Sequence, residues 1–101
     1  MNEDRIHVAS KLMNFETPPK THDEFYEMMH KFIEDLVLNR TEHLAQTFYR
    51  LDIDESRVNE AFEDASSTSE LISRITDLLI ERLEAIARLR TLCAANNRDE
   101  R

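Results

Sequence analysis

The sequence predicts an all-α protein with two long antiparallel helices, at about 22–50 and 68–94, and a short helix at about 55–65 between them. Three observations predict this fold class. The 101 residues include no glycine and only two prolines, so β-hairpin turns and phosphate-binding loops lose their usual residue. Apolar residues recur at helical spacing over both long segments. Each long segment also begins at a capping box.

The first 20 residues form either an arm or a short helix ahead of a helical domain that we place at 21–95. The spacing of Ile6, Ala9 and Leu12 suits a helix. Ile6, Val8 and Leu12 would also suit an extended arm. A Thr-Pro-Pro sequence ends this segment, because the residue before a proline is pushed out of helical geometry.

The first long helix is expected to begin after Thr21, which forms a capping box with Glu24. Its apolar stripe consists of Phe25, Met28, Met29, Phe32, Ile33, Leu36 and Val37. The same phase continues beyond Asn39 to Leu44, Thr47, Phe48 and Leu51. Neither glycine nor proline interrupts residues 39–41. We therefore predict one helix over 22–50, either straight or bent near Asn39. The alternative is that residues 39–42 form a C-cap followed by a new N-cap.

The short helix is expected to start at an Asp54 cap, with Ile53 and Val58 forming a hydrophobic staple. It should bury four apolar residues, which are Val58, Ala61, Phe62 and Ala65. The second long helix follows a capping box made by Ser67 and Glu70. Residues 96–101 are polar and are predicted to be a disordered tail.

The apolar face of the second long helix predicts a homodimer. On a helical wheel this face spans roughly 160°, which is wider than a two-helix seam needs. Two helices of roughly 40 Å also exceed what a compact chain of this size requires. We therefore predict that two copies form a four-helix-type core. Leu38 and Ile80 lie off the main stripes and are candidates for the contact surface, whereas Cys93 lies on the stripe and is expected to be a core thiol.

Arg82 projects from the middle of this apolar face. Such an arginine needs a partner, or an edge at which its head reaches water. We predict a structural ion pair with Asp52 or Glu55, and keep an interface pair and a ligand-binding arginine as alternatives. Tyr49 and Arg50 lie at the same predicted helix break and complete the candidate site.

The stretch from Leu44 to Arg90 resembles a group of short bacterial proteins with a "LYRIDVSE" phrase followed by "LIIERQ". The corresponding phrases here are FYRLDIDE and LLIERL. The residues that match are Tyr49, Arg50, Asp52, Glu55, Glu81 and Arg82. Phe48, Asp54 and Leu83 depart from the pattern. The resemblance implies an all-α fold, and it implies no activity because none is established for that group.

Motifs that would carry catalysis or bind a metal are weak. Glu27 and His30 have the Glu-x-x-His spacing of di-iron bundles, but they lie on a polar helix face and no second motif exists. We predict no catalytic residues, no metal and no cofactor. The alternative is a small helical enzyme with an interface site around Arg82. It would be similar to pyrophosphohydrolases, through paired glutamates, or to chorismate mutases, through a Leu-Leu-x-x-Arg stretch.

The acidic composition restricts the partners. A net charge of −8 argues against nucleic acid and against an anionic membrane surface. One cysteine cannot form an internal disulfide, and no secretion signal or membrane span is recognisable, which indicates a cytoplasmic protein. The sequence therefore favours a non-enzymatic interaction, adaptor or regulatory protein that acts through helical surfaces on an unknown protein partner.

Overall fold

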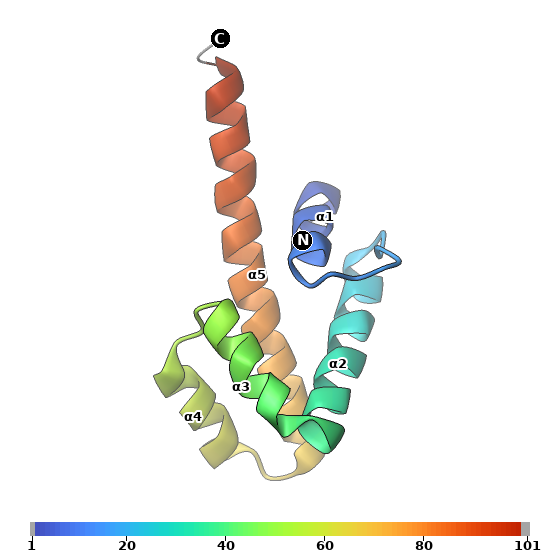
Figure 1. The fold of residues 1–101 in the computed structure, drawn as a ribbon, viewed down its shortest axis with the longest axis vertical. Coiled ribbons are helices and arrows are strands. Elements are labelled where there is room, and N and C mark those ends of the chain that lie inside the picture. Colours follow the sequence, from blue (N-terminus) through green and yellow to red (C-terminus); the bar gives the residue numbers. More distant parts are fainter. Residues whose placement is uncertain (1, 100–101) are drawn as a thin grey trace.

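The computed structural model describes residues 2–99, with side chains through Cys93. These residues form five helices and no strand (Figure 1). The helices are α1 (Glu3–Leu12), α2 (His22–Asn39), α3 (Thr41–Arg50), α4 (Glu55–Asp64) and α5 (Thr68–Asp99). The all-α prediction is confirmed. In the described range no helix has the length and apolar character that crossing a membrane requires.

Side-chain caps start three of the helices where the sequence predicted them. The backbone N–H of Glu24 donates to Thr21 Oγ1 at 3.1 Å, and that of Glu70 donates to Ser67 Oγ at 3.1 Å. At α4, the N–H of Ser56 donates to Asp54 Oδ1 at 3.0 Å. These bonds satisfy N–H groups that have no partner inside the first helical turn.

The prediction of one helix over 22–50 is wrong, because the chain leaves helical geometry at Arg40. This residue has φ −142° and ψ 59°. The carboxylate of Asp35 receives hydrogen bonds from the Asn39 amide and from the Arg40 guanidinium, both at 3.0 Å, and so fastens the turn. The apolar stripe continues in phase on both sides of the turn, which is why the pattern alone did not reveal the break. Leu44 still reaches the core.

Two helices end without glycine in a motif that normally favours it. After α3, Asp52 takes φ 55°, the N–H of Asp52 donates to the Tyr49 carbonyl, and that of Ile53 donates to the Phe48 carbonyl at 3.0 Å. This is a Schellman motif with an aspartate in the left-handed position. Asn14, with φ 58°, plays the same part after α1.

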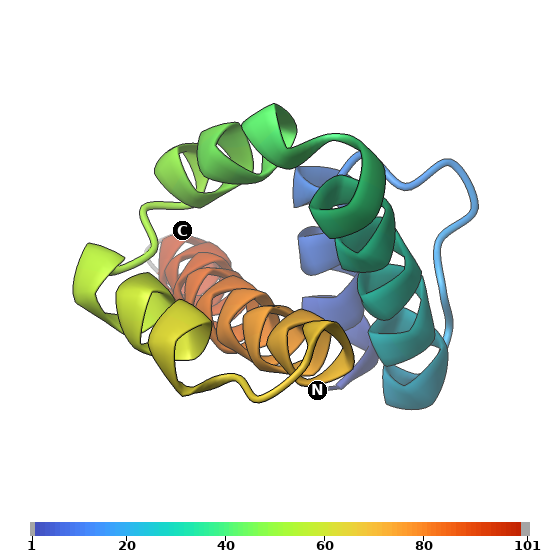
Figure 2. The same cartoon turned by 90° about the horizontal axis from the view of Figure 1, so that it is seen from below.

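The core forms around α5. Helices α1, α2 and α4 all pack on α5, whereas α3 packs mainly on α2 (Figures 1 and 2). Helix α2 runs in the opposite direction to α5 (Figure 1). The largest fully buried side chains are Phe25, Met29, Ile33, Leu36, Ile75, Leu79, Leu83 and Thr76. The N-terminal segment is therefore a helix that belongs to the same packed unit as α2 and α5.

Helix α1 covers part of the α5 surface that the sequence assigned to a second copy. Ile6 and Ala9 are buried in the same core as Leu79 and Leu83. Ile80, a candidate for the contact surface, is only 8% exposed, because α5 has neighbours on more than one side. Ile80 is therefore a core residue. The other candidate, Leu38, is 59% exposed.

Other apolar residues are less buried than predicted. Phe62 is 47% exposed, and Ala61 is the only described residue of α4 that is buried. Cys93 is exposed, so the prediction of a core thiol is wrong. The helix runs through Asp99 and thus includes residues 96–99 of the predicted tail, whereas residues 100 and 101 lie outside the described part.

Candidate functional site

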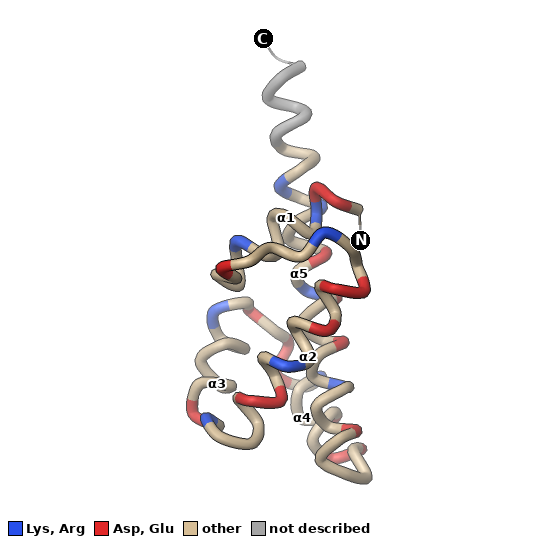
Figure 3. Tube along the Cα trace, turned by 90° about the vertical axis from the view of Figure 1, so that its right-hand side faces the viewer, with Lys and Arg blue, Asp and Glu red and all other residues tan. Residues whose placement is uncertain are grey.

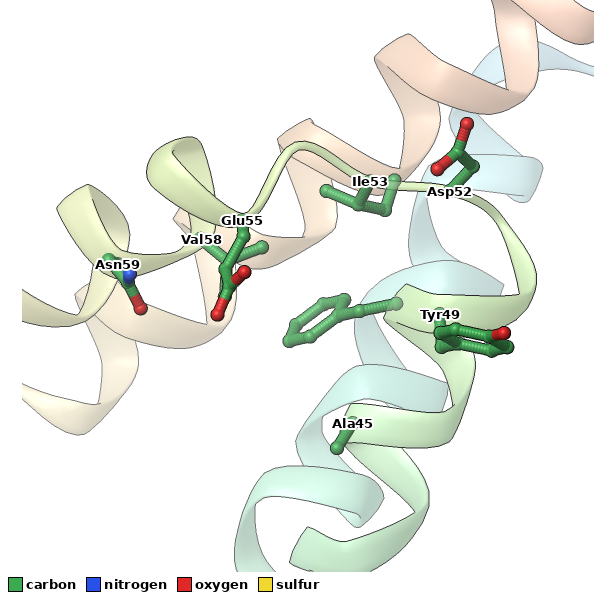
Figure 4. Close-up of a pocket in the computed structure, with 8 residues that line it drawn as sticks. Ala45, Tyr49, Asp52, Ile53, Glu55, Val58 and Asn59 are labelled. Atoms are coloured by element: carbon green, nitrogen blue, oxygen red, sulfur yellow. The ribbon is translucent and has the colours of Figure 1, made fainter.

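A groove of about 670 Å³ lies between α3 and α4 (Figure 4). We call it the α3–α4 groove. Its lining comes from one face of each helix and from the turn that joins them, since spacings of three and four place residues on one side of a helix. The lining residues are Ala45, Phe48 and Tyr49 from α3, Asp52 and Ile53 from the turn, and Glu55, Val58 and Asn59 from α4.

The inner part of the groove is apolar. Phe48 and Ile53 pack against the edge of the core, and Val58 is half-buried. The Schellman motif fixes Phe48 and Ile53 relative to each other, because the N–H of Ile53 donates to the Phe48 carbonyl. Tyr49 lies on the outer side of α3 with 90% of its surface exposed (Figure 4). An aromatic ring that exposed contributes little to this chain's own packing.

The rim of the groove is acidic. Asp52 and Glu55 lie along it, and both are exposed. The segment 52–64 carries six acidic residues and only one basic residue, Arg57. Helix α2 is also acidic, with five acidic residues and one lysine, whereas the two signs are mixed along α5 (Figure 3). The groove therefore combines an apolar floor with a negative edge, which suits a partner that is both apolar and basic.

Arg82 lies next to the groove but does not line it. Its Nε donates to the Leu51 carbonyl at 2.9 Å, and its Nη2 lies 3.8 Å from Asp52 Oδ2. The Asp52 side chain is 94% exposed, so solvent screens that ion pair. Glu55, the other predicted partner, faces the groove instead. The carbonyl at the end of α3 is thus the main partner of Arg82, and the guanidinium links α3 to α5.

A second hollow, of about 280 Å³, brings Arg82 together with Arg57. Two hydrogen bonds, of 2.9 and 2.8 Å, join the Arg57 guanidinium to the Glu81 carboxylate. Hydrogen bonding to Arg57 lowers the pKa of Glu81, and the same contact raises the pKa of Arg57. Both arginines therefore already have oxygen partners within the chain.

Arg50 is separated from the rest of the predicted site. It lies in a hollow formed with α1 and α2, where its Nη2 is 4.0 Å from the Met13 sulfur. The five predicted site residues thus divide into three places: Tyr49, Asp52 and Glu55 line the α3–α4 groove, Arg82 adjoins it, and Arg50 faces away from it.

Metal-ligating side chains do not gather in the described part of the chain. No group of three or more histidine, cysteine, aspartate or glutamate residues there could hold a metal ion. Glu27 is exposed, and the His30 ring lies against Tyr26, with ring centroids 6.1 Å apart.

The sequence reasoning missed the floor of the groove. Phe48 was assigned to the stripe of a continuous helix, and Val58 was expected to be buried. The spacing Ala45–Phe48–Tyr49–Asp52 does place these residues on one face, but the face becomes a groove wall only because the chain turns twice, at Arg40 and at Asp52. The first of those turns has only a weak local signal, the polar residues 39–42, and the apolar stripe continues in phase across it.

Comparison of the chain with family models, with curated proteins and with solved structures gave no match.

Proposed function

We propose that this protein is a non-enzymatic interaction protein, an adaptor or regulator, that binds an amphipathic helix of a protein partner in the α3–α4 groove. The observation that carries the proposal is the half-buried apolar floor formed by Phe48, Ile53 and Val58, with the 90% exposed ring of Tyr49 beside it on the outer side of α3. An aromatic and aliphatic groove between two helices is a common receptor for the apolar face of a third.

The enzyme alternative has less support. An active site around Arg82 would need a guanidinium free to bind substrate, a second cation and a carboxylate near it. Arg57 and three carboxylates do lie around the same hollow as Arg82. However, Arg57 is engaged by Glu81, and Arg82 is engaged by the Leu51 carbonyl. A substrate would have to displace these partners.

We also propose that the chain forms a homodimer and acts in the cytoplasm. The dimer need not contain a shared four-helix core, because α1 takes a place on α5 within the chain. What supports a dimer now is the apolar surface that is left exposed, which includes Leu38, Leu89 and Leu92. An exposed free thiol at Cys93 suits a reducing compartment. The acidic rim of the groove would repel the phosphates of a nucleic acid.

A photo-crosslinking amino acid at position 49 tests the proposal in living cells. Because Tyr49 is almost fully exposed, replacing it with p-benzoylphenylalanine should leave the fold intact. We expect irradiation to attach a helical segment of a protein, from this chain or from another, to position 49. The matched control places the same residue at Lys31, which is exposed on α2 outside the groove. Equal adducts at both positions, or none at position 49, would contradict the proposal.

A further inference from the structure

The end of α5 is a second unusual surface. Helix α5 has 32 residues, or about 48 Å at the usual rise, and the molecule is 51 Å long. Its last described buried residue is Ala87. Beyond it lie residues 88–93, which we call the C-terminal segment, and the end of α5 extends past the other helices (Figure 1).

The C-terminal segment is apolar on one side and basic. Leu89 is 63% exposed and Leu92 is 55% exposed, and their spacing places them on the same face of α5. Arg88 and Arg90 are the only charged residues in 85–93. In a chain of net charge −8, this is a local excess of positive charge beside exposed leucines. An amphipathic basic helix is the chemistry that the α3–α4 groove is suited to bind.

We infer that the C-terminal segment of one copy docks in the α3–α4 groove of a second copy. The inference rests on the proposed function, since it names the helix that the groove receives. Leu89 and Leu92 would cover the floor formed by Phe48, Ile53 and Val58. Arg88 and Arg90 would meet the two acidic residues of the groove rim, Asp52 and Glu55. Apolar surface and charge match at the same contact.

The occupant must come from a second copy. Helix α5 is continuous from Thr68 to Asp99, so its end cannot fold back to the groove of its own chain (Figure 1). Helices α3 and α4, which form the groove, lie beside the lower part of α5 in this view, and the C-terminal segment lies in its upper part. Two copies placed antiparallel along their long axes therefore bring each segment beside the other groove.

Reciprocal docking doubles the area of the interface. Stable interfaces bury on the order of 1,200 Å² or more, which one short helical segment does not supply. A two-fold arrangement uses each contact twice, because the same surface patch appears on both copies. In this arrangement each C-terminal segment fills the groove of the other copy, so no groove is left open. The assembly therefore stops at a dimer and does not grow into a filament.

The single cysteine makes the contact directly testable. Cys93 is exposed and adjoins Leu92, so a benzophenone maleimide can be attached at the end of the C-terminal segment. Labelled chain is mixed with ¹⁵N-labelled chain, irradiated and mapped by mass spectrometry. We expect adducts between position 93 of one copy and residues 45–59 of the other. Adducts to the partner's α5, or no adducts between copies, would overturn the inference.

A control variant carries the benzophenone at a position outside the C-terminal segment. A Cys93→Ser, Lys31→Cys variant places the same group on the exposed face of α2, and we expect no adduct to residues 45–59 from it. Adducts there at equal yield would mean that the benzophenone reacts with the groove unspecifically, which also overturns the inference.

Charge exchange provides an independent readout by sedimentation equilibrium. Arg88→Glu with Arg90→Glu should weaken dimerisation by about tenfold or more, and so should Glu55→Arg with Asn59→Arg in the groove. An equimolar mixture of the two variants should recover much of the affinity. In the mixed dimer, one contact pairs the two reversed surfaces and the other pairs the two unmutated ones, so opposite charges face each other in both. A matched pair, Lys20→Glu with Lys31→Glu, should leave dimerisation unchanged. Failure of the mixture to recover affinity would count against the docking.

The two proposals fail in different ways. If position 49 is crosslinked to a different protein while position 93 never reaches residues 45–59, the groove is a binding site and the inference about its occupant is wrong. If neither position gives a specific adduct, both are wrong.

Discussion

The two halves of this molecule are packed to different degrees. Helices α1, α2 and α5 bury side chains completely, including Phe25, Ile33 and Leu79. Helices α3 and α4 share few buried residues and leave Tyr49 and Phe62 largely exposed. The first unit therefore has the density that stabilises a fold, whereas the second has a groove that another helix could fill.

This difference suggests a division of labour. Helices α3 and α4 can remain in place with few contacts between them, because each packs on a helix of the first unit. Here α3 is attached to α2 and α4 to α5, and Arg82 connects the end of α3 to α5 through the Leu51 carbonyl. Mutations should thus affect stability in the first unit and binding in the second.

The largest effect is expected from Leu79→Ala, in the packed unit. Leu79 is fully buried, so truncation removes apolar contacts and leaves a cavity, at a cost of about 2–5 kcal/mol in the free energy of unfolding. Phe62→Ala removes more atoms, but from a side chain that is 47% exposed, and should cost less than half as much. Urea denaturation at neutral pH measures both. Equal costs would show that α4 is as tightly packed as the core.

Mutations at the contact between α3 and α5 should lower the free energy of unfolding by less than Leu79→Ala does. Replacing Arg82 by methionine keeps much of the apolar stem and removes the hydrogen bond to Leu51, and we expect a loss of about 1.5 kcal/mol in the same measurement. Asp52→Asn keeps a residue that tolerates positive φ and removes only a solvent-exposed charge. It should cost less than about 0.5 kcal/mol. If Asp52→Asn were as costly as Arg82→Met, the carboxylate and not the carbonyl would be the main partner of Arg82.

Much of this architecture can be predicted from the sequence, because the signals that start a helix act locally. Capping residues and apolar spacing act over one or two turns, and they correctly placed the starts of α2, α4 and α5. The break at Arg40 depends on Asp35 binding two side chains beyond it, while the stripe on both sides stays in phase. Periodicity cannot show such a turn, so the groove that results from it was not foreseen.

The candidate site was only partly predictable for a related reason. Tyr49, Asp52 and Glu55 were singled out because they cluster at a helix end, and they do line one groove. Their expected role, partnership with Arg82, concerned a contact between segments distant in the chain. The structure gives that contact mainly to the Leu51 backbone, which no side-chain pattern records.

The N-terminal caps of α2 and α3 also differ between the two units, and mutations there should have smaller effects on stability. Thr21 caps α2, so Thr21→Ala should lower the unfolding free energy by about 1 kcal/mol. Helix α3 begins at Thr41 without any side-chain cap hydrogen bond, and Thr41→Ala should change stability by less than about 0.5 kcal/mol. Thermal denaturation of the two variants in parallel is sufficient. A costly Thr41→Ala would reveal an anchor for α3 that the cap geometry does not show.

The smallest effect at neutral pH concerns Glu70, where α4 connects to α5. Hydrogen bonds from the Ser66 hydroxyl, the Arg74 side chain and the Ser66 backbone lower the pKa of Glu70 from 4.5 to about 2. Because the folded-state pKa is lower than the unfolded one, the stabilisation is complete above pH 4.5 and disappears as the pH falls toward 2. The ionised Glu70 side chain therefore gives its full stabilisation of the fold only above pH 4.5.

Melting temperatures of wild type and Glu70→Gln between pH 2 and 6 give the measurement. We expect a constant difference above pH 4.5 that shrinks to nothing near pH 2, with the exposed Glu34→Gln on α2 as the matched control. A difference independent of pH would mean that protonated Glu70 supports the fold as well as the carboxylate does. In that case the hydrogen-bond geometry of the cap, and not the charge of Glu70, would stabilise the connection between α4 and α5. Helix α4 would then stay attached to α5 at low pH.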